Sequence, residues 1–221
     1  MRQKTKPRIF WVGILIYLIV PVNSFAQNNT WELWTGAALS KKMTDRFKVS
    51  INPEFRFAGQ FDQKEWRLEA GIDYLPFRIL ELGINYRFNS LHNPDGDKTN
   101  SHTFSSDVRF KYPIQRFKIE ARGRFTNYNE FGEPINLENP YLRYRLKMEY
   151  DLPNSKFRPM TSVEWFHQLS EHEINKIRYS VGVDYRFNKK HALGATYHYQ
   201  DYLKKEKYRN MVELSYKFKF N

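Results

Sequence analysis

Strict alternation of apolar and polar residues constrains this chain most, because it recurs in eleven segments of about ten residues each. Residues 80–88, LELGINYRF, show it clearly: every second residue is aliphatic or aromatic, and the residues between are charged, polar or glycine. Successive side chains of a β-strand point to opposite faces, so the pattern predicts strands with one apolar and one charged face. We therefore expect an all-β fold.

The segments are long for strands of a water-soluble protein. Most have ten to twelve residues, which matches the roughly 9–11 that cross a bilayer at a tilt, whereas globular strands more often have about five or six. We therefore predict a single antiparallel transmembrane β-barrel of 10–12 strands, with the apolar faces toward lipid. The predicted strands are residues 31–41, 47–57, 66–76, 80–90, 102–113, 117–128, 140–151, 157–169, 176–187, 192–203 and 209–220.

Eleven strands raise a question of parity, because bacterial single-chain barrels usually have an even number of strands. Three arrangements are open. The first segment, Trp31 to Lys41, could lie at the seam or inside the lumen and leave ten strands. A strand could be missed, or two could be merged. Finally, eleven strands could close the barrel with one parallel pair.

The first 26 residues have the features of a secretion signal. Four basic residues precede position 9, residues 10–20 are an apolar run, and residues 24–26 form a plausible cleavage site. The apolar run is shorter than the roughly 20 residues that a transmembrane helix needs. We therefore divide the chain into a cleaved signal, residues 1–26, and a barrel domain, residues 27–221. Export would place the barrel in the outer membrane of a Gram-negative bacterium.

The charged faces of the strands predict the content of the lumen. An Arg or Lys at the bilayer midplane costs about 2–4 kcal/mol, so these side chains are expected to face inward and to pair with carboxylates. Such a network would leave room only for small solutes. The expected lumen charge network comprises Arg67, Glu69, Asp73, Glu81, Arg87, Arg109, Glu120, Arg122, Arg143, Arg145, Glu149, Arg178, Asp184, Arg186 and Glu213, with Asp107 and Arg124 on the same faces.

The connections between the strands alternate in length. Transmembrane barrels have short periplasmic turns and longer external loops, so the two sets predict the orientation of the barrel. The chain would then end on the periplasmic side. The short, periplasmic set lies near 42–46, 77–79, 114–116, 152–156 and 188–191, and the longer, external set near 58–65, 91–101, 129–139, 170–175 and 204–208.

No motif in the sequence predicts a metal or a cofactor. The chain has neither cysteine nor an HExxH pattern, and we expect no cofactor. Residues 93–97 are turn residues with two acids, and we interpret them as a plain turn. A second group, Glu164, His167, Glu171, His172 and Glu173, is interpreted as a solvated polar loop at a strand end.

One serine-rich segment contains the residue types of a hydrolase site. Ser101, His102, Ser105, Ser106 and Asp107 lie close together at the start of a predicted strand. A nucleophile needs a base within hydrogen-bond reach, but Ser105 and Asp107 share a strand face that His102 does not. We therefore predict no catalytic residues and no enzymatic activity.

The charge of the chain bears on its partners. The formal net charge is +12, with the basic residues spread along the strand faces instead of gathered in one patch. Since the chain is expected to be exported, nucleic acid is not an expected partner. Outer-membrane lipid and lipopolysaccharide are expected instead, together with the barrel-assembly machinery during biogenesis. Aromatic residues make up 17% of the chain, which suits girdles at head-group depth.

Short stretches at both ends of the chain resemble a known family. They are ELWTGA at 32–37, LSKK at 39–42, FKVSI at 47–51, LRYRLK at 142–147, NKIRY at 175–179 and YKFKF at 216–220. They resemble an uncharacterised family of predicted outer-membrane proteins, domain of unknown function 2490, over nearly the whole chain after the signal. The resemblance implies a β-barrel without an assigned activity, so it carries over no catalytic residues.

The sequence therefore favours a barrel that is structural or that allows limited passage of small solutes, with a lumen filled by charge. Two alternatives stay open. One is a membrane-embedded hydrolase of lipid or lipopolysaccharide, and the other is a soluble periplasmic barrel that binds an apolar ligand with its apolar face inward.

Overall fold

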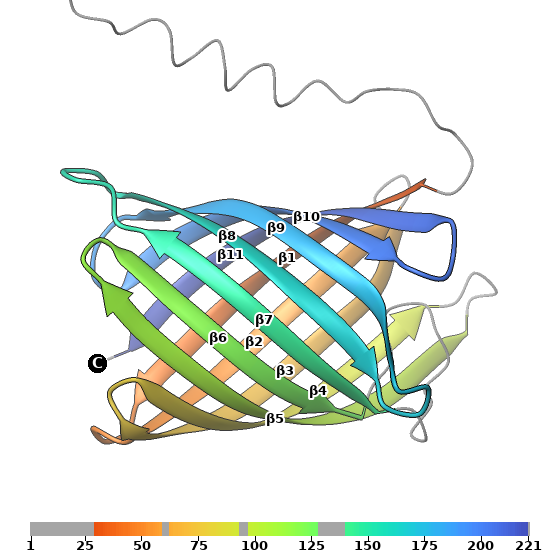
Figure 1. Cartoon of the computed structure of the whole chain (residues 1–221), viewed down its shortest axis with the longest axis horizontal. Helices are drawn as coiled ribbons and strands as arrows, with labels where there is room; N and C mark the ends of the chain where they lie inside the picture. Colours follow the sequence, from red (N-terminus) through yellow and green to blue (C-terminus); the bar gives the residue numbers. More distant parts are fainter. Residues whose placement is uncertain (1–28, 59–61, 93–96, 128–139, 221) are drawn as a thin grey trace, which may run out of the picture.

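The chain folds into eleven strands that wrap into one barrel (Figure 1). The structure is a computed structural model that describes residues 29–58, 62–92, 97–127 and 140–220. The predicted signal and most of the predicted 93–97 turn lie outside the described residues. The strands are β1 (Asn29–Lys42), β2 (Phe47–Ala58), β3 (Asp62–Phe77), β4 (Leu80–His92), β5 (Lys98–Ile114), β6 (Phe117–Thr126), β7 (Tyr141–Tyr150), β8 (Phe157–Gln168), β9 (Glu173–Arg186), β10 (His191–Tyr202) and β11 (Lys207–Phe220).

Each strand pairs with the next one along the chain, and β1 pairs with β11 to close the barrel. All sequential pairs are antiparallel, whereas β1 and β11 run parallel, in a register from Asn29 opposite Tyr208 to Lys41 opposite Phe220. The prediction of an antiparallel barrel of 10–12 strands is therefore confirmed, with one parallel pair at the seam. Of the three open arrangements, the structure adopts eleven strands with a parallel closure.

The parallel seam fixes where the two ends of the barrel chain lie. An odd number of strands leaves the first and the last pointing in the same direction. The start of β1 and the end of β11 therefore lie at opposite ends of the barrel (Figure 1). The inward and outward positions still match across the seam, since Trp34 lies opposite Glu213 and Leu33 opposite Val212.

The two faces of the wall are the reverse of those in a water-soluble barrel. Outward residues such as Ile84 (71% exposed) and Val181 (58%) are apolar, while inward residues such as Glu81 and Asn85 (4% each) are polar. Among the described residues, twenty-three polar side chains are buried against five apolar or aromatic ones. The alternative barrel with its apolar face inward is therefore wrong. Within the described ranges, the chain has no helix of the length and apolarity that crossing a membrane requires.

Aromatic rings gather on the outside near both ends of the strands. At one end, Phe117 packs on Tyr150 with ring centroids 4.8 Å apart, and Phe157 packs similarly on Tyr185 at 4.9 Å. Toward the other end, Trp66 packs on Phe88 at 5.2 Å. Amphipathic rings favour the depth of lipid head groups, so two such belts suit a barrel that crosses a bilayer.

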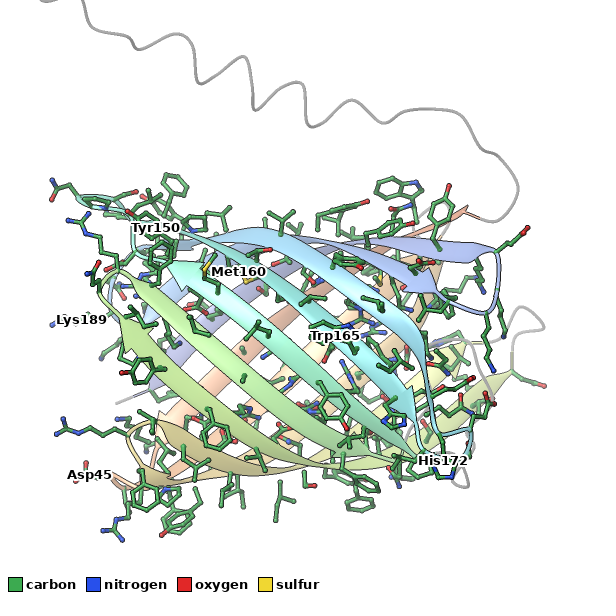
Figure 2. All side chains as sticks on the ribbon, in the orientation of Figure 1. Asp45, Tyr150, Met160, Trp165, His172 and Lys189 are labelled. Carbon is green, nitrogen blue, oxygen red and sulfur yellow. The ribbon has the colours of Figure 1, made fainter. Side chains whose placement is uncertain are left out.

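The connections lie at the two ends of the barrel, as predicted, but their lengths differ less than expected. Asp45 and Lys189 lie at one end and His172 at the other (Figure 2). The predicted external connections are shorter because several strands begin earlier than predicted; β5, for example, starts at Lys98, which pairs with His92. Backbone hydrogen bonds extend a ladder regardless of side-chain polarity, so polar residues continue the strands. Among the described strands, the interval from the end of β6 at Thr126 to the start of β7 at Tyr141 is longer than the intervals between the other consecutive strands.

Candidate functional site

A cavity of about 430 Å³ lies inside the barrel, and all eleven strands contribute to its lining. Its wall is strongly cationic: twelve Arg and Lys residues line it against four Glu residues. A cationic surface in a confined space concentrates anions and repels cations. Several other inward carboxylates pair with cations of this lining: Asp107 with Arg124, Glu120 with Arg145, and Glu149 with Lys147.

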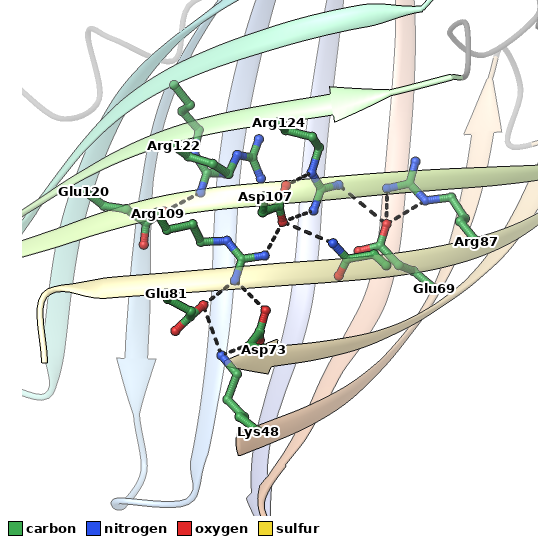
Figure 3. A network of polar contacts seen from close by, with 12 residues as sticks. Lys48, Glu69, Asp73, Glu81, Arg87, Asp107, Arg109, Glu120, Arg122 and Arg124 are labelled. Carbon is green, nitrogen blue, oxygen red and sulfur yellow. Dashed lines mark hydrogen bonds and ion pairs between the residues drawn. The ribbon is translucent and has the colours of Figure 1, made fainter. Parts of the chain in front are cut away.

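One cluster of ion pairs links inward side chains of the four strands β2 to β5 (Figure 3). Arg109 donates a hydrogen bond to Asp73 at 2.9 Å, and it also binds Glu81 and Asp107. Lys48 pairs with Asp73 at 2.9 Å, and Lys111 on β5 pairs with Glu81 at 2.7 Å. Arg109 therefore holds three carboxylates from three strands together.

A second cluster surrounds Asp107, whose side chain is fully buried. Arg124 donates to its carboxylate from Nε at 2.5 Å and from Nη2 at 2.7 Å, and Asn85 donates from Nδ2 at 3.2 Å. Nearby, Arg87 donates from Nε to Glu69 at 2.9 Å (Figure 3). Charge-assisted hydrogen bonds are stronger than neutral ones, and the bidentate bond between Arg124 and Asp107 also fixes the orientation of both side chains.

On the adjoining wall, from β6 to β9, one carboxylate pairs with several arginines. Glu164 on β8 accepts from Arg122 at 2.5 Å and from Arg143 at 3.0 Å, and Arg178 lies 3.9 Å from it. Arg145 pairs with Glu120 at 2.6 Å. Cations therefore outnumber carboxylates locally on the wall from β6 to β9.

Aromatic faces complete the cavity wall beside these cations. The guanidinium of Arg56 lies 3.6 Å from the ring centre of Trp34, and that of Arg143 lies 4.6 Å from the ring centre of Phe166. Lys176, only 2% exposed, holds its ammonium 4.7 Å from the ring centre of Tyr141. The negative face of an aromatic ring attracts a cation, so these rings help to stabilise the buried positive charge.

The fifteen residues predicted for the lumen network lie on the inward faces, but they do not all meet at the cavity. Glu149 pairs with Lys147 at 2.7 Å, and Asp184 pairs with Lys217 at 2.6 Å. Arg186 lies near the end of β9, outside the cavity lining. The cavity is lined by Arg67, Glu69, Arg87, Arg122, Arg143, Arg145, Arg178 and Glu213 of the predicted set.

Sequence reasoning missed several buried charges of the lumen. Glu164, Lys176 and Arg209 are all less than 9% exposed and line the cavity. The sequence interpretation groups Glu164 with the polar loop that follows it, although its alternation with Ser162 and Phe166 on β8 places it inside. Strand alternation was therefore the signal that could have found it.

The structure divides the serine-rich segment between the two faces of the wall, as the alternation predicted. His102 lies on the outer face, where its Nδ1 is hydrogen-bonded to the hydroxyl of Tyr86 at 2.6 Å, whereas Ser105 and Asp107 point inward. The group of Glu164 and the loop residues after it is also divided. Glu164 pairs with arginines in the lumen, whereas the carboxylate of Glu171 lies 3.9 Å from Nζ of Lys204 at the end of the barrel. The part of the chain that the structure describes brings no three His, Asp or Glu side chains together as a metal site.

The structure brings together a different serine, histidine and carboxylate, which sequence reasoning did not find. The hydroxyl of Ser180 is hydrogen-bonded to Nδ1 of His198 at 2.8 Å, and Nε2 of His198 is 3.1 Å from the carboxylate of Glu213. The three residues come from β9, β10 and β11, and all three line the cavity. A histidine held between a hydroxyl and a carboxylate has the contacts of a general base.

Comparison with known proteins bears on the family more than on the activity. No curated protein matches the sequence. The beta domain of the Bordetella autotransporter Brka is 11% identical, with a TM-score of 0.45, over 77% of this chain and 82% of that one. A chain from a study of the in-meso crystallization of membrane proteins is 14% identical, with a TM-score of 0.40, over 74% of this chain and 68% of that one. These two likenesses are too low to carry an argument.

The family match is more extensive. Residues 31–212, which run from β1 into β11, match the family described as Protein of unknown function (DUF2490). This confirms the resemblance seen in the short sequence stretches. The chain therefore belongs to the DUF2490 family, whose description assigns no activity.

Proposed function

We propose that this protein is an outer-membrane barrel whose lumen is sealed by ion pairs, so that it is structural or passes only small solutes. The apolar outer face with its two aromatic belts supports a place in a bilayer, and the predicted secretion signal supports export. Membrane lipid and lipopolysaccharide would contact the outer face, and the barrel-assembly machinery would insert it.

The ion-paired lumen is the observation that carries this proposal. Arg109 links Asp73, Glu81 and Asp107 on one wall, and Glu164 links three arginines on the other. Separating a buried ion pair costs free energy, because each charge is left without its partner. These side chains therefore stay paired inside the lumen and narrow it. The remaining space of about 430 Å³ is that of a small-molecule site, not of a wide aqueous channel.

Planar-bilayer recording of the refolded protein tests the seal. We expect little or no conductance at neutral pH for the native chain. Arg109→Ala should increase the conductance, because it removes the ion pairs with three carboxylates at once. Arg158→Ala is the matched control, since Arg158 pairs with the half-exposed Asp151 outside the cavity. Large, steady, pore-like conductance of the native chain would refute the seal and would make a diffusion channel the leading function.

A membrane-embedded hydrolase is the second candidate, and one observation favours it: the contacts of Ser180, His198 and Glu213. Hydrolysis would also need donors for the oxyanion of the intermediate. Backbone N–H groups within the strands of a closed barrel are used in the ladders, so arginine side chains of the cavity would have to serve. This requirement is why we rank the hydrolase second.

A fluorophosphonate probe separates the two candidates, because it labels a serine that a neighbouring base activates. A hydrolase would show labelling of the folded protein that Ser180→Ala abolishes. Ser162→Ala is the matched control, since Ser162 lies opposite Ser180 on the neighbouring strand and lines the same cavity. Absence of labelling in the native chain would exclude an activated serine and leave the sealed barrel.

A further inference from the structure

Four inward arginines form a block on two neighbouring strands. Arg122 lies opposite Arg145 and Arg124 opposite Arg143 in the pairing of β6 with β7, and all four line the cavity. Like charges directly opposite each other destabilise a sheet. Two such pairs side by side repel each other, and negative charge bound next to them in the cavity would reduce that repulsion.

The fixed carboxylates supply only part of that negative charge. Asp107 pairs with Arg124 but is shared with Arg109, which lies outside the block. Glu120 pairs with Arg145, and Glu164 is divided between two block arginines. Glu69 also lies 3.6 Å from Arg124 but pairs with Arg87. The four guanidinium groups therefore face four carboxylates, three of which also serve arginines outside the block, so the block keeps a positive charge.

Unused hydrogen-bond donors point to the same conclusion. The Nε atoms of Arg122, Arg143 and Arg145 are buried and have no acceptor among the described residues. A guanidinium has five N–H donors and no acceptor, so only an oxygen-rich anion or water can satisfy these atoms. Buried donors without acceptors cost free energy, so a small rotation of these side chains that turned the donors to an anion in the cavity would be favourable.

We propose that this arginine block is the binding site for the phosphate group of a small solute. This inference rests on the proposed function and names the class of solute that the lumen admits. Guanidinium groups bind phosphate through paired N–H···O bonds. A phosphate offers oxygens to donors on both strands at once, whereas a single carboxylate has two oxygens and one charge. The cavity of about 430 Å³ leaves room for the rest of a small phosphorylated molecule.

Calorimetric titration with inorganic phosphate tests the site on protein refolded in an uncharged maltoside detergent, at constant ionic strength. We expect saturable binding to the native chain and at least tenfold weaker binding to Arg143→Gln. Lys118→Gln is the matched control, because it removes an inward cation of β6 outside the cavity, and its affinity should stay within twofold. No saturable binding to the native chain, or equal losses in both variants, would overturn the proposal.

A variant that removes a negative charge instead of a positive one keeps the test decisive if an arginine variant fails to fold. Glu164→Gln removes the carboxylate that competes for Arg122 and Arg143, so phosphate should bind more tightly than in the native chain. Weaker binding would overturn the proposal. Dodecyl phosphate micelles form a further arm: a lumenal site admits free phosphate but not a head group in a micelle. Binding only to the micelles would place the phosphate site on the outer face and refute the proposal.

The titration is independent of the conductance recordings. Phosphate binding together with a large conductance would refute the seal and leave the site standing. A barrel that shows little conductance and binds no phosphate would refute the phosphate site and leave the seal standing.

Discussion

Replacing Asp107 by alanine should destabilise the barrel strongly, because this carboxylate is fully buried in the second ion-pair cluster. The substitution removes both bonds from Arg124, the bond from Asn85 and the contact with Arg109. Breaking a buried pair by deleting one partner costs about 3–5 kcal/mol. We expect a loss of about 3 kcal/mol in the free energy of unfolding, at the low end of that range.

Three remaining contacts explain why we expect this lower value. Arg109 keeps Asp73 and Glu81, and Arg124 lies 3.6 Å from Glu69, so neither guanidinium is left without a carboxylate nearby. Changing Arg124 to methionine in the Asp107→Ala background should recover part of the loss, because the guanidinium that has lost its two hydrogen bonds to Asp107 is then removed as well.

Urea unfolding from lipid vesicles, followed by tryptophan fluorescence, measures the effect. The matched control is Asp151→Ala: Asp151 is 56% exposed and pairs with Arg158 at 2.9 Å, so its loss should cost no more than about 1 kcal/mol. Asp107→Asn, which keeps the shape, serves if the alanine variant does not fold. Losses that are equal for Asp107 and Asp151 would refute the reasoning that the lumen pairs hold the barrel.

Two further predictions concern the topology. Cysteines at Thr35 and Leu214, which lie opposite each other across the parallel seam, should form a disulfide under oxidation, whereas cysteines at Thr35 and Phe218 should not, because Phe218 pairs four residues further along β1. The reverse result would exclude this register of the closure. An epitope tag inserted at Lys205 should be detected on intact cells, since loops tolerate insertions, and a tag at Asn154 should be detected only after the outer membrane is opened. Detection of the second tag alone on intact cells would invert the orientation.

Most of the wall could be predicted from the sequence, because strand periodicity is a local property. All eleven predicted segments are strands, and outward residues such as Leu68, Leu146 and Leu214 lie on the exposed face, as the alternation indicated. The closure was not predictable in the same way. The alternation of β1 fits a strand in the wall, whatever the direction of its neighbour, so only the pairing with β11 settled the parity.

The contacts in the lumen depend on the register between strands, which the alternation of apolar and polar residues does not reveal. Arg122 on β6 reaches Glu164 on β8 across the whole of β7, and Arg109 on β5 reaches Asp73 on β3 across β4. Such pairs follow from the tilt of the strands and the curvature of the wall. The order of charges along each strand predicted which residues point inward, but not which carboxylate each arginine meets. Strand faces alone likewise could not bring Ser180 and His198 together.

Thiol labelling in intact membranes tests the central claim most directly, namely that the apolar face meets lipid. The chain has no cysteine, so each introduced thiol is the only one. Cysteines at Ile84 and Val181, on the exposed apolar face, should resist a water-soluble maleimide while the barrel is folded in the membrane. A cysteine at Asn154, in the connection between β7 and β8, should react freely once the outer membrane is opened. Labelling at Ile84 and Val181 as fast as at Asn154 in the folded protein would contradict the account.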